Sequence, residues 1–166
     1  MPRLPLHMML RDGLLVIATV AVLLASHRMQ DEEQGGWIAV GWVAGILLPV
    51  CGYLVHEWGH LMGCLLSRSR VHFPSTPLAL LLFRYDTGRN DRRQFLSMFC
   101  GGFLASVAIV AVYAWTLQWH YLADRIALLL TSMGVLATFV LEIPEAWRVY
   151  RGGPLPTGKA FVNEIP

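Results

Sequence analysis

The chain has 166 residues, of which 55% are hydrophobic and 14% are charged, and its formal net charge is +2. A soluble domain carries about a quarter charged residues, so this composition excludes an ordinary soluble protein and predicts one that is surrounded by a lipid bilayer. The net charge is too small to indicate a nucleic-acid partner, and we expect none.

Long apolar segments follow one another along the chain. We expect an all-α membrane protein with about four transmembrane helices, which form a single membrane domain over residues 1–166. The predicted spans cover about residues 13–30, 37–66, 95–119 and 126–147. Pro49 divides the second span, and we expect a tilt or kink there because proline removes a backbone donor.

The segment of residues 67–94, between the second and third spans, has a different character. Pro74, Pro77 and Gly88 argue against a helix through it, and its apolar run Leu78–Phe83 is too short to cross a bilayer. We expect a short hairpin or re-entrant loop near the membrane surface. An exposed strand edge there could hold an unwound peptide by β-addition, but the segment could also be a plain connection between two spans.

Basic residues are distributed unequally between the two sides of the predicted membrane. Four spans place the N-terminal segment, residues 67–94 and the tail of residues 148–166 on one side, and this side holds eleven Lys and Arg residues. The two opposite loops hold only Arg28 and Arg125. By the positive-inside rule, we expect both termini to be cytoplasmic, in an integral protein of a bacterial inner (plasma) membrane.

The second span contains HEWGH, residues His56 to His60, which matches the pattern H-E-x-x-H. Residues four apart lie on one face of a helix, so both imidazoles can reach one Zn²⁺ ion. Glu57 can then contact a metal-bound water, whose pKa zinc lowers to about 7, and can pass its proton to a leaving amine. The chemistry implied is metal-assisted hydrolysis of an amide.

The membrane context strengthens this interpretation of the motif. Each ionisable group deep in a bilayer costs on the order of 2–3 kcal/mol or more, so such groups usually have a function. The alternative is a polar cluster of histidine and glutamate that joins helices or binds some other cofactor. Gly59 and Gly63 lie four residues apart, a spacing at which small residues let another helix approach closely, although glycine is also common in membrane helices.

With these motifs the chain resembles the site-2 protease family of intramembrane zinc metalloproteases. The resemblance rests on HEWGH in a membrane helix, on the hairpin-like segment followed by FCGGFLASV, and on LEIPEAWRVYRGGPLPTG in and after the last span. It implies hydrolysis of peptide bonds in membrane-embedded substrates. Two elements depart from the family. Gly101 and Gly102 match the glycine of a Gly-Pro-x-x-Asn-like element without its proline and asparagine, and the Asp-Gly that carries the third zinc ligand is absent.

A catalytic zinc ion needs a third protein ligand besides the two histidines. Our first choice is Glu142, which lies in the apolar run TFVLEIP, followed by Glu145 and then by Asp86 in the hairpin segment. Alternatively, Glu142 pairs with an arginine such as Arg148, Glu145 is a solvated carboxylate, and Asp86 forms surface ion pairs.

Two further residues could contribute ligands. His72 opens the hairpin segment, which could fold back toward the metal, and Cys64 lies four residues after His60 on the same helical face. Packing is the alternative for the cysteine, and an interfacial position is the alternative for His72.

Three interpretations of function compete on this sequence. The first is an intramembrane zinc metalloprotease-like enzyme that acts on a membrane protein substrate. The second is a catalytically inactive relative that serves as a structural or accessory subunit of a membrane protein complex. Metal handling without catalysis is a third interpretation. Retention of Glu57 favours the enzyme, whereas the missing Asp-Gly favours the inactive relative.

Overall fold

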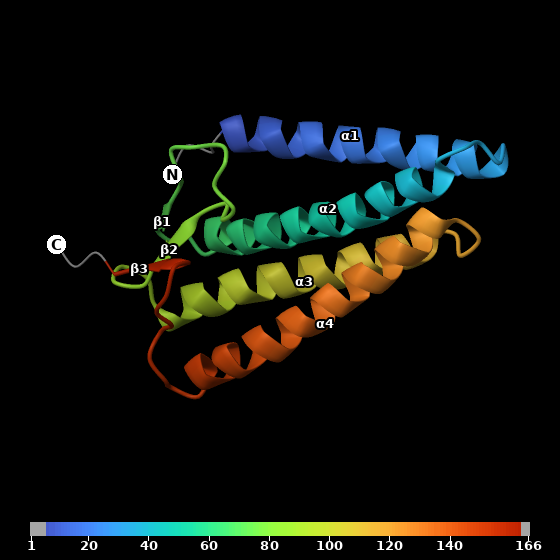
Figure 1. Ribbon diagram of the computed structural model, residues 1–166. Coiled ribbons are helices and arrows are strands. Elements are labelled where there is room, and N and C mark those ends of the chain that lie inside the picture. The colour runs from blue at the N-terminus through green and yellow to red at the C-terminus, as the bar shows by residue number, and fades with distance from the viewer. Residues whose placement is uncertain (1–5, 164–166) are drawn as a thin grey trace.

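The computed structural model describes residues 6–163, and four long helices account for most of them (Figure 1). They are α1 (Leu6–Asp31), α2 (Trp37–Leu66), α3 (Arg92–Thr116) and α4 (Leu122–Tyr150). Each is long and apolar enough to cross a membrane. Even α3, with 25 residues, is about 38 Å long at 1.5 Å per residue, more than the roughly 30 Å of a hydrocarbon core. The predicted all-α fold with four transmembrane helices is confirmed.

Three of the four helices begin earlier than the apolar pattern predicts. The hydropathy of a segment marks its lipid-facing part, whereas the helix continues through the polar residues that flank it. α3 begins three residues early because Asp91 caps it. The Asp91 carboxylate accepts the Gln94 backbone N–H, and the Gln94 side chain accepts the Asp91 N–H, both over 2.9 Å.

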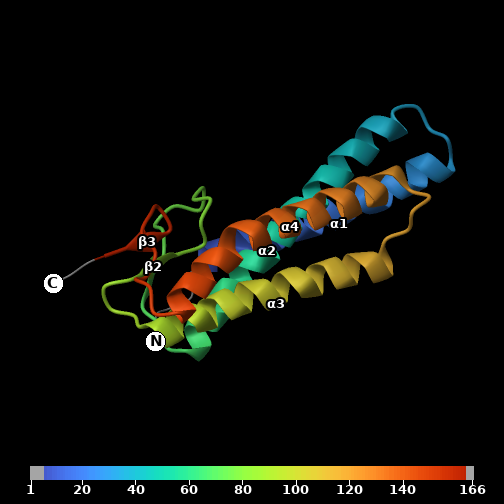
Figure 2. The ribbon, with the colours of Figure 1, turned by 90° about the horizontal axis from the view of Figure 1, so that it is seen from below.

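The four helices lie side by side, and α2 packs against each of the other three (Figures 1 and 2). The outward faces carry exposed apolar side chains, such as Ile17 on α1 and Met133 on α4. Such faces suit a lipid environment, because lipid tails are as apolar as leucine. α2 is continuous through Pro49 and is the helix to which the rest of the bundle is attached.

Two glycines of α2 bring its backbone against α3. A Cβ atom at Gly59 would lie 2.6 Å from the carbonyl oxygen of Gly101, and one at Gly63 would overlap the backbone of Ser97 and Met98. Only glycine leaves room for so close an approach. The helix contact that this four-residue spacing predicts is therefore present.

A small sheet lies at one end of the bundle, beside the start of α1 (Figures 1 and 2). Its strands are β1 (Val71–His72), β2 (Arg84–Asp86) and β3 (Phe161–Val162), in the order β1-β2-β3. β1 and β2 pair antiparallel, and β2 and β3 pair parallel. The hairpin expected within residues 67–94 is present, whereas β3 lies in the segment that was expected to be only a tail.

The connection between β1 and β2 is tied to the first helix. The Arg11 guanidinium donates from Nη1 to the carbonyls of Pro77 and Ala79, each over 2.8 Å. Leu78 and Leu80 are 88% and 86% exposed, so the outer side of this loop is apolar. The loop thus covers one side of the bundle end at which the sheet lies.

Candidate metal centre

His56, His60 and Glu142 come together where α2 faces α4. The Nε2 atom of His56 lies 3.4 Å from Glu142 Oε1, and the Nε2 atom of His60 lies 3.7 Å from Glu142 Oε2. The two Nε2 atoms are 2.9 Å apart. Within residues 6–163, this is the one cluster of three potential metal ligands whose donor atoms all lie within 4.8 Å of one another.

The spacing of these donor atoms fits one small ion. Ligands placed tetrahedrally at about 2.0–2.1 Å from a zinc ion are separated from each other by about 3.3 Å. The three separations of 2.9, 3.4 and 3.7 Å lie on both sides of that value. A metal ion can therefore enter with shifts of only a few tenths of an ångström in the side chains.

The opposite nitrogen of each ring forms a hydrogen bond to α3. His56 Nδ1 lies 2.8 Å from Ser106 Oγ and 3.3 Å from the Gly102 carbonyl, and His60 Nδ1 lies 3.0 Å from the Met98 carbonyl. A carbonyl only accepts, so each Nδ1 carries the proton and each Nε2 presents a lone pair. When both rings are neutral, these lone pairs face each other across 2.9 Å, and a cation bound between them would relieve their repulsion.

Gly102 makes space for the second of these rings. A Cβ atom at this position would overlap the His60 imidazole, so a side chain there would displace the ring. Its neighbour Gly101 packs on the backbone of Gly59 instead. The two glycines of FCGG thus have separate roles, one in the helix contact and one in the metal centre.

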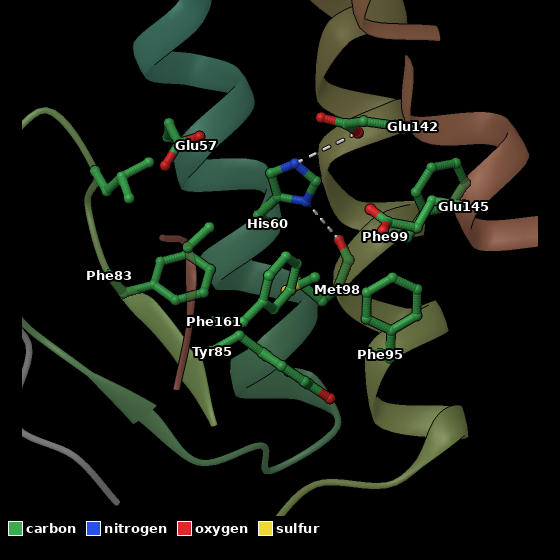
Figure 3. A pocket seen from close by; sticks show the side chains of 12 residues that line it. Glu57, His60, Phe83, Tyr85, Phe95, Met98, Phe99, Glu142, Glu145 and Phe161 are labelled. Carbon is green, nitrogen blue, oxygen red and sulfur yellow. Dashed lines mark hydrogen bonds and ion pairs between the residues drawn. The ribbon is translucent and has the colours of Figure 1, made fainter. Parts of the chain in front are cut away.

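A cavity of about 280 Å³ opens beside the cluster at the sheet end of the bundle (Figure 3). The carboxylates of Glu57, Glu142 and Glu145 and the imidazole of His60 lie on its wall. The rest of the wall is mostly apolar and comes from the hairpin, α3 and the segment after α4, as Leu81, Phe83, Tyr85, Phe95, Met98, Phe99, Ala160 and Phe161. Burial raises the pKa of Tyr85, so its hydroxyl stays neutral beside the cavity. The volume is at the lower end of the range for ligand sites.

Glu57 faces the same cavity without joining the three ligands. Figure 3 shows the Glu57 and Glu142 carboxylates on either side of the His60 ring. Glu57 Oε2 accepts the backbone N–H of Leu82 over 3.5 Å, so the hairpin loop orients this carboxylate. A group in this place can exchange a proton with a molecule in the cavity.

The acids considered for the third ligand differ in their contacts. Arg148 pairs with Glu145 over 3.4 Å, which leaves Glu142 to the two imidazoles. Glu145 lines the cavity but lies outside the cluster. Of the three acids considered from the sequence, Glu142 is the one that the fold brings to both histidines.

The ion pairing expected for Asp86 is present with Arg89, but the carboxylate is buried rather than at the surface. Asp86 is 0% exposed, and its carboxylate accepts the backbone N–H groups of Gly88 and Arg89. His72 Nε2 lies 3.2 Å from the same carboxylate, so this histidine belongs to the sheet rather than to the metal cluster. Arg89 Nε lies 3.8 Å away and forms the outer part of this pair.

Cys64 is a packing residue. It is buried in the apolar cluster that includes Leu61 and Tyr85, and it is not part of the metal cluster. Sequence reasoning missed Ser106 as the partner of His56, and it missed Phe161 as part of the cavity wall. The apolar run around Ser106 is the only signal for the first, because a hydroxyl in such a run needs a partner.

Comparison with known proteins adds no relative to this description. No family model matches the chain, and neither a curated protein nor a solved structure matches it significantly. The interpretation of the cluster therefore depends on its own geometry.

Proposed function

We propose that the chain is an intramembrane zinc metalloprotease-like protein that hydrolyses peptide bonds of membrane-embedded substrates. One observation carries the proposal: two imidazoles and a carboxylate converge on one point inside a bundle of apolar helices, beside a cavity that also contains Glu57. Two histidines and one carboxylate are a donor set that catalytic zinc uses, and such sites keep a fourth position open.

The proposed roles divide among four side chains. His56, His60 and Glu142 hold the ion, which when bound supplies Lewis-acid chemistry that acidifies water and polarises a carbonyl. Glu57 accepts a proton from the attacking water and returns it to the leaving amine. Water reaches the site from the cavity, because the bilayer encloses the other sides of the bundle.

The location of the cavity supports entry of substrate from the sheet end. This end carries the hairpin and the segment after α4, and by the distribution of Lys and Arg we place it on the cytoplasmic side. A transmembrane helix hides its carbonyls in internal hydrogen bonds, so a segment must unwind before it is cut. The strands beside the cavity offer backbone groups that can hold an unwound segment.

Metal analysis of purified protein tests the site, and Glu145 provides a matched control. Wild type is expected to retain about one zinc ion per chain, and His56→Ala and Glu142→Ala are expected to lose most of it. Glu145 lines the same cavity, but its carboxylate pairs with Arg148. Glu145→Ala protein should therefore retain zinc as wild type does. Equal zinc in all four proteins would refute the proposed site.

The second candidate function is an inactive relative that acts as an accessory subunit of a membrane complex. The absence of the Asp-Gly and of the complete Gly-Pro-x-x-Asn-like element favours it. A strain carrying Glu57→Gln separates the two candidates. Accumulation of an uncut membrane protein in this strain supports the enzyme. Unchanged membrane substrates together with loss of a complex subunit in a strain lacking the chain would establish the accessory role.

A further inference from the structure

The strand β2 has two edges, and both are paired. β1 covers one edge, and the segment after α4 covers the other as β3. On the β3 side, the backbone N–H of Tyr85 donates to the Ala160 carbonyl over 2.9 Å. The backbone N–H of Thr87 donates to the Val162 carbonyl over 2.7 Å. This edge of β2 therefore already binds an extended segment that runs parallel to it.

The edge that β3 covers is the one beside the metal centre. Tyr85 of β2 and Ala160 and Phe161 of the later segment line the cavity together with Glu57 and His60, whereas within the described chain no residue of β1 lines it (Figure 3). A peptide on this edge lies next to the reacting groups, and a peptide on the outer edge of β1 does not.

One side chain anchors the segment. The Phe161 ring packs edge-on against Tyr85 and lies beside Phe95, with centroid separations of 6.4 and 6.5 Å. The other contacts are to backbone atoms, since Arg84 donates to the carbonyls of Lys159 and Phe161 over 3.2 and 3.4 Å. The edge therefore selects an extended chain with one aromatic or large apolar residue.

The strand that the segment adds to the sheet is short. β3 has two residues, and the Lys159 side chain beside it is exposed. Gly158 has φ 147, a conformation that residues with a side chain rarely adopt, so the turn into β3 depends on glycine. A short strand with one anchoring ring and few backbone bonds can exchange with a competing peptide.

We propose that residues 157–163 are a built-in competitor for the peptide site on β2. The segment occupies the edge on which an unwound, extended segment of a membrane protein lies for cleavage, and substrate must displace it. This inference depends on the proposed function for its biological meaning, but occupancy of the edge does not depend on hydrolysis.

Binding of a labelled peptide tests the competition directly. The probe is TGKAFVN, the sequence of residues 157–163, added to the full chain in detergent micelles and followed by fluorescence anisotropy. A tethered segment acts at a high effective concentration, so we expect the probe to bind Phe161→Ala protein about tenfold more tightly than wild type. Lys159→Ala changes only an exposed side chain and is expected to match wild type.

A second variant keeps the test decisive if Phe161→Ala does not fold. Gly158→Ala strains the turn of the attached segment and leaves the edge and the Phe161 ring intact, so it too should bind the probe more tightly than wild type. The peptide TGKAAVN should bind both variants more weakly than TGKAFVN. Equal probe affinity in wild type and both variants, or no binding to any, would overturn the proposal.

The same measurements in a Glu57→Gln background separate this inference from the proposed function. Tighter probe binding in the tail variants, without cleavage of any membrane protein by the chain with Glu57 intact, would support the competitor and refute the protease. Cleavage by the chain with Glu57 intact, together with unchanged probe affinity in the tail variants, would support the protease and refute the competitor.

Discussion

Within residues 6–163, contacts between histidines and carboxylates join helices at two places, at opposite ends of the bundle. At the sheet end, His56 and His60 face Glu142. At the other end, His27 Nε2 of α1 lies 2.6 Å from Asp124 Oδ1 of α4. Both places join apolar helices, although Asp124 lies in the first turn of α4, just before the predicted apolar span.

The surroundings of the two contacts differ. Asp124 is 1% exposed, its second oxygen accepts the backbone N–H of Gln118 over 2.8 Å, and the Tyr121 ring stacks on His27. The Asp124 carboxylate is therefore buried, and both of its oxygens have a hydrogen-bond partner. The metal centre has a second imidazole, two lone pairs aimed at one point and a cavity beside it. The His27–Asp124 pair only joins two helices. The cluster of His56, His60 and Glu142 has three donor atoms close together and a cavity beside them, which a binding site needs.

The largest expected effect on zinc affinity comes from a change at Gly102. We expect Gly102→Ala to weaken zinc binding by about 100-fold, the upper range for loss of an outer partner, because a Cβ atom there overlaps the His60 ring and displaces it. Gly134→Ala is the matched control in α4, since a Cβ atom at Gly134 has no neighbour within 4 Å. Competition with a chelator measures both affinities. Similar values for the two variants would show that the His60 position is unimportant.

The His27–Asp124 pair should affect stability and leave the metal unaffected. His27→Ala leaves a buried carboxylate without its partner, so we expect the free energy of unfolding to fall by about 2 kcal/mol, given that His27 is partly exposed. Thermal unfolding in micelles measures this, with unchanged zinc content. His120→Ala is the control, because the His120 ring contacts the same Tyr121 ring, in a tilted arrangement, without an ion pair to Asp124. Loss of zinc in His27→Ala protein would erase the distinction between the two ends.

The smallest expected effect on zinc affinity comes from removal of the Ser106 hydroxyl. Ser106→Ala removes the hydroxyl that holds His56 Nδ1, and we expect zinc affinity to fall by about tenfold. Ser97→Ala is the matched control on the same helix, because the Ser97 hydroxyl donates to the Gly63 carbonyl, away from the ligands. Ser106→Ala protein with wild-type affinity would mean that the Gly102 carbonyl alone orients the ring.

The features that could be predicted from the sequence depend on local spacing. Apolar length predicts the four helices, the i,i+4 spacing places His56 and His60 on one face, and Gly59 with Gly63 predicts the close approach of another helix, without showing which one. Glu142 could be chosen because a carboxylate in an apolar run needs a partner. These arguments need only the neighbours of each residue along one helix.

The features that were missed depend on residues far apart in the chain. The two-residue strand β3 has no periodicity of its own, and its pairing with β2 joins Tyr85 to Phe161. Asp86 is buried because its own turn supplies backbone donors, which a stretch rich in arginine does not reveal. Ser106 meets His56 only through the packing of α2 on α3.

The most direct test of the central claim is X-ray absorption at the zinc edge on protein purified with its metal. We predict nitrogen and oxygen ligands alone, at about 2.0–2.1 Å, with the scattering pattern of two imidazoles, and loss of this signal in His60→Ala protein. A sulfur ligand at about 2.3 Å, or a spectrum that His60→Ala leaves unchanged, would contradict an ion held by His56, His60 and Glu142.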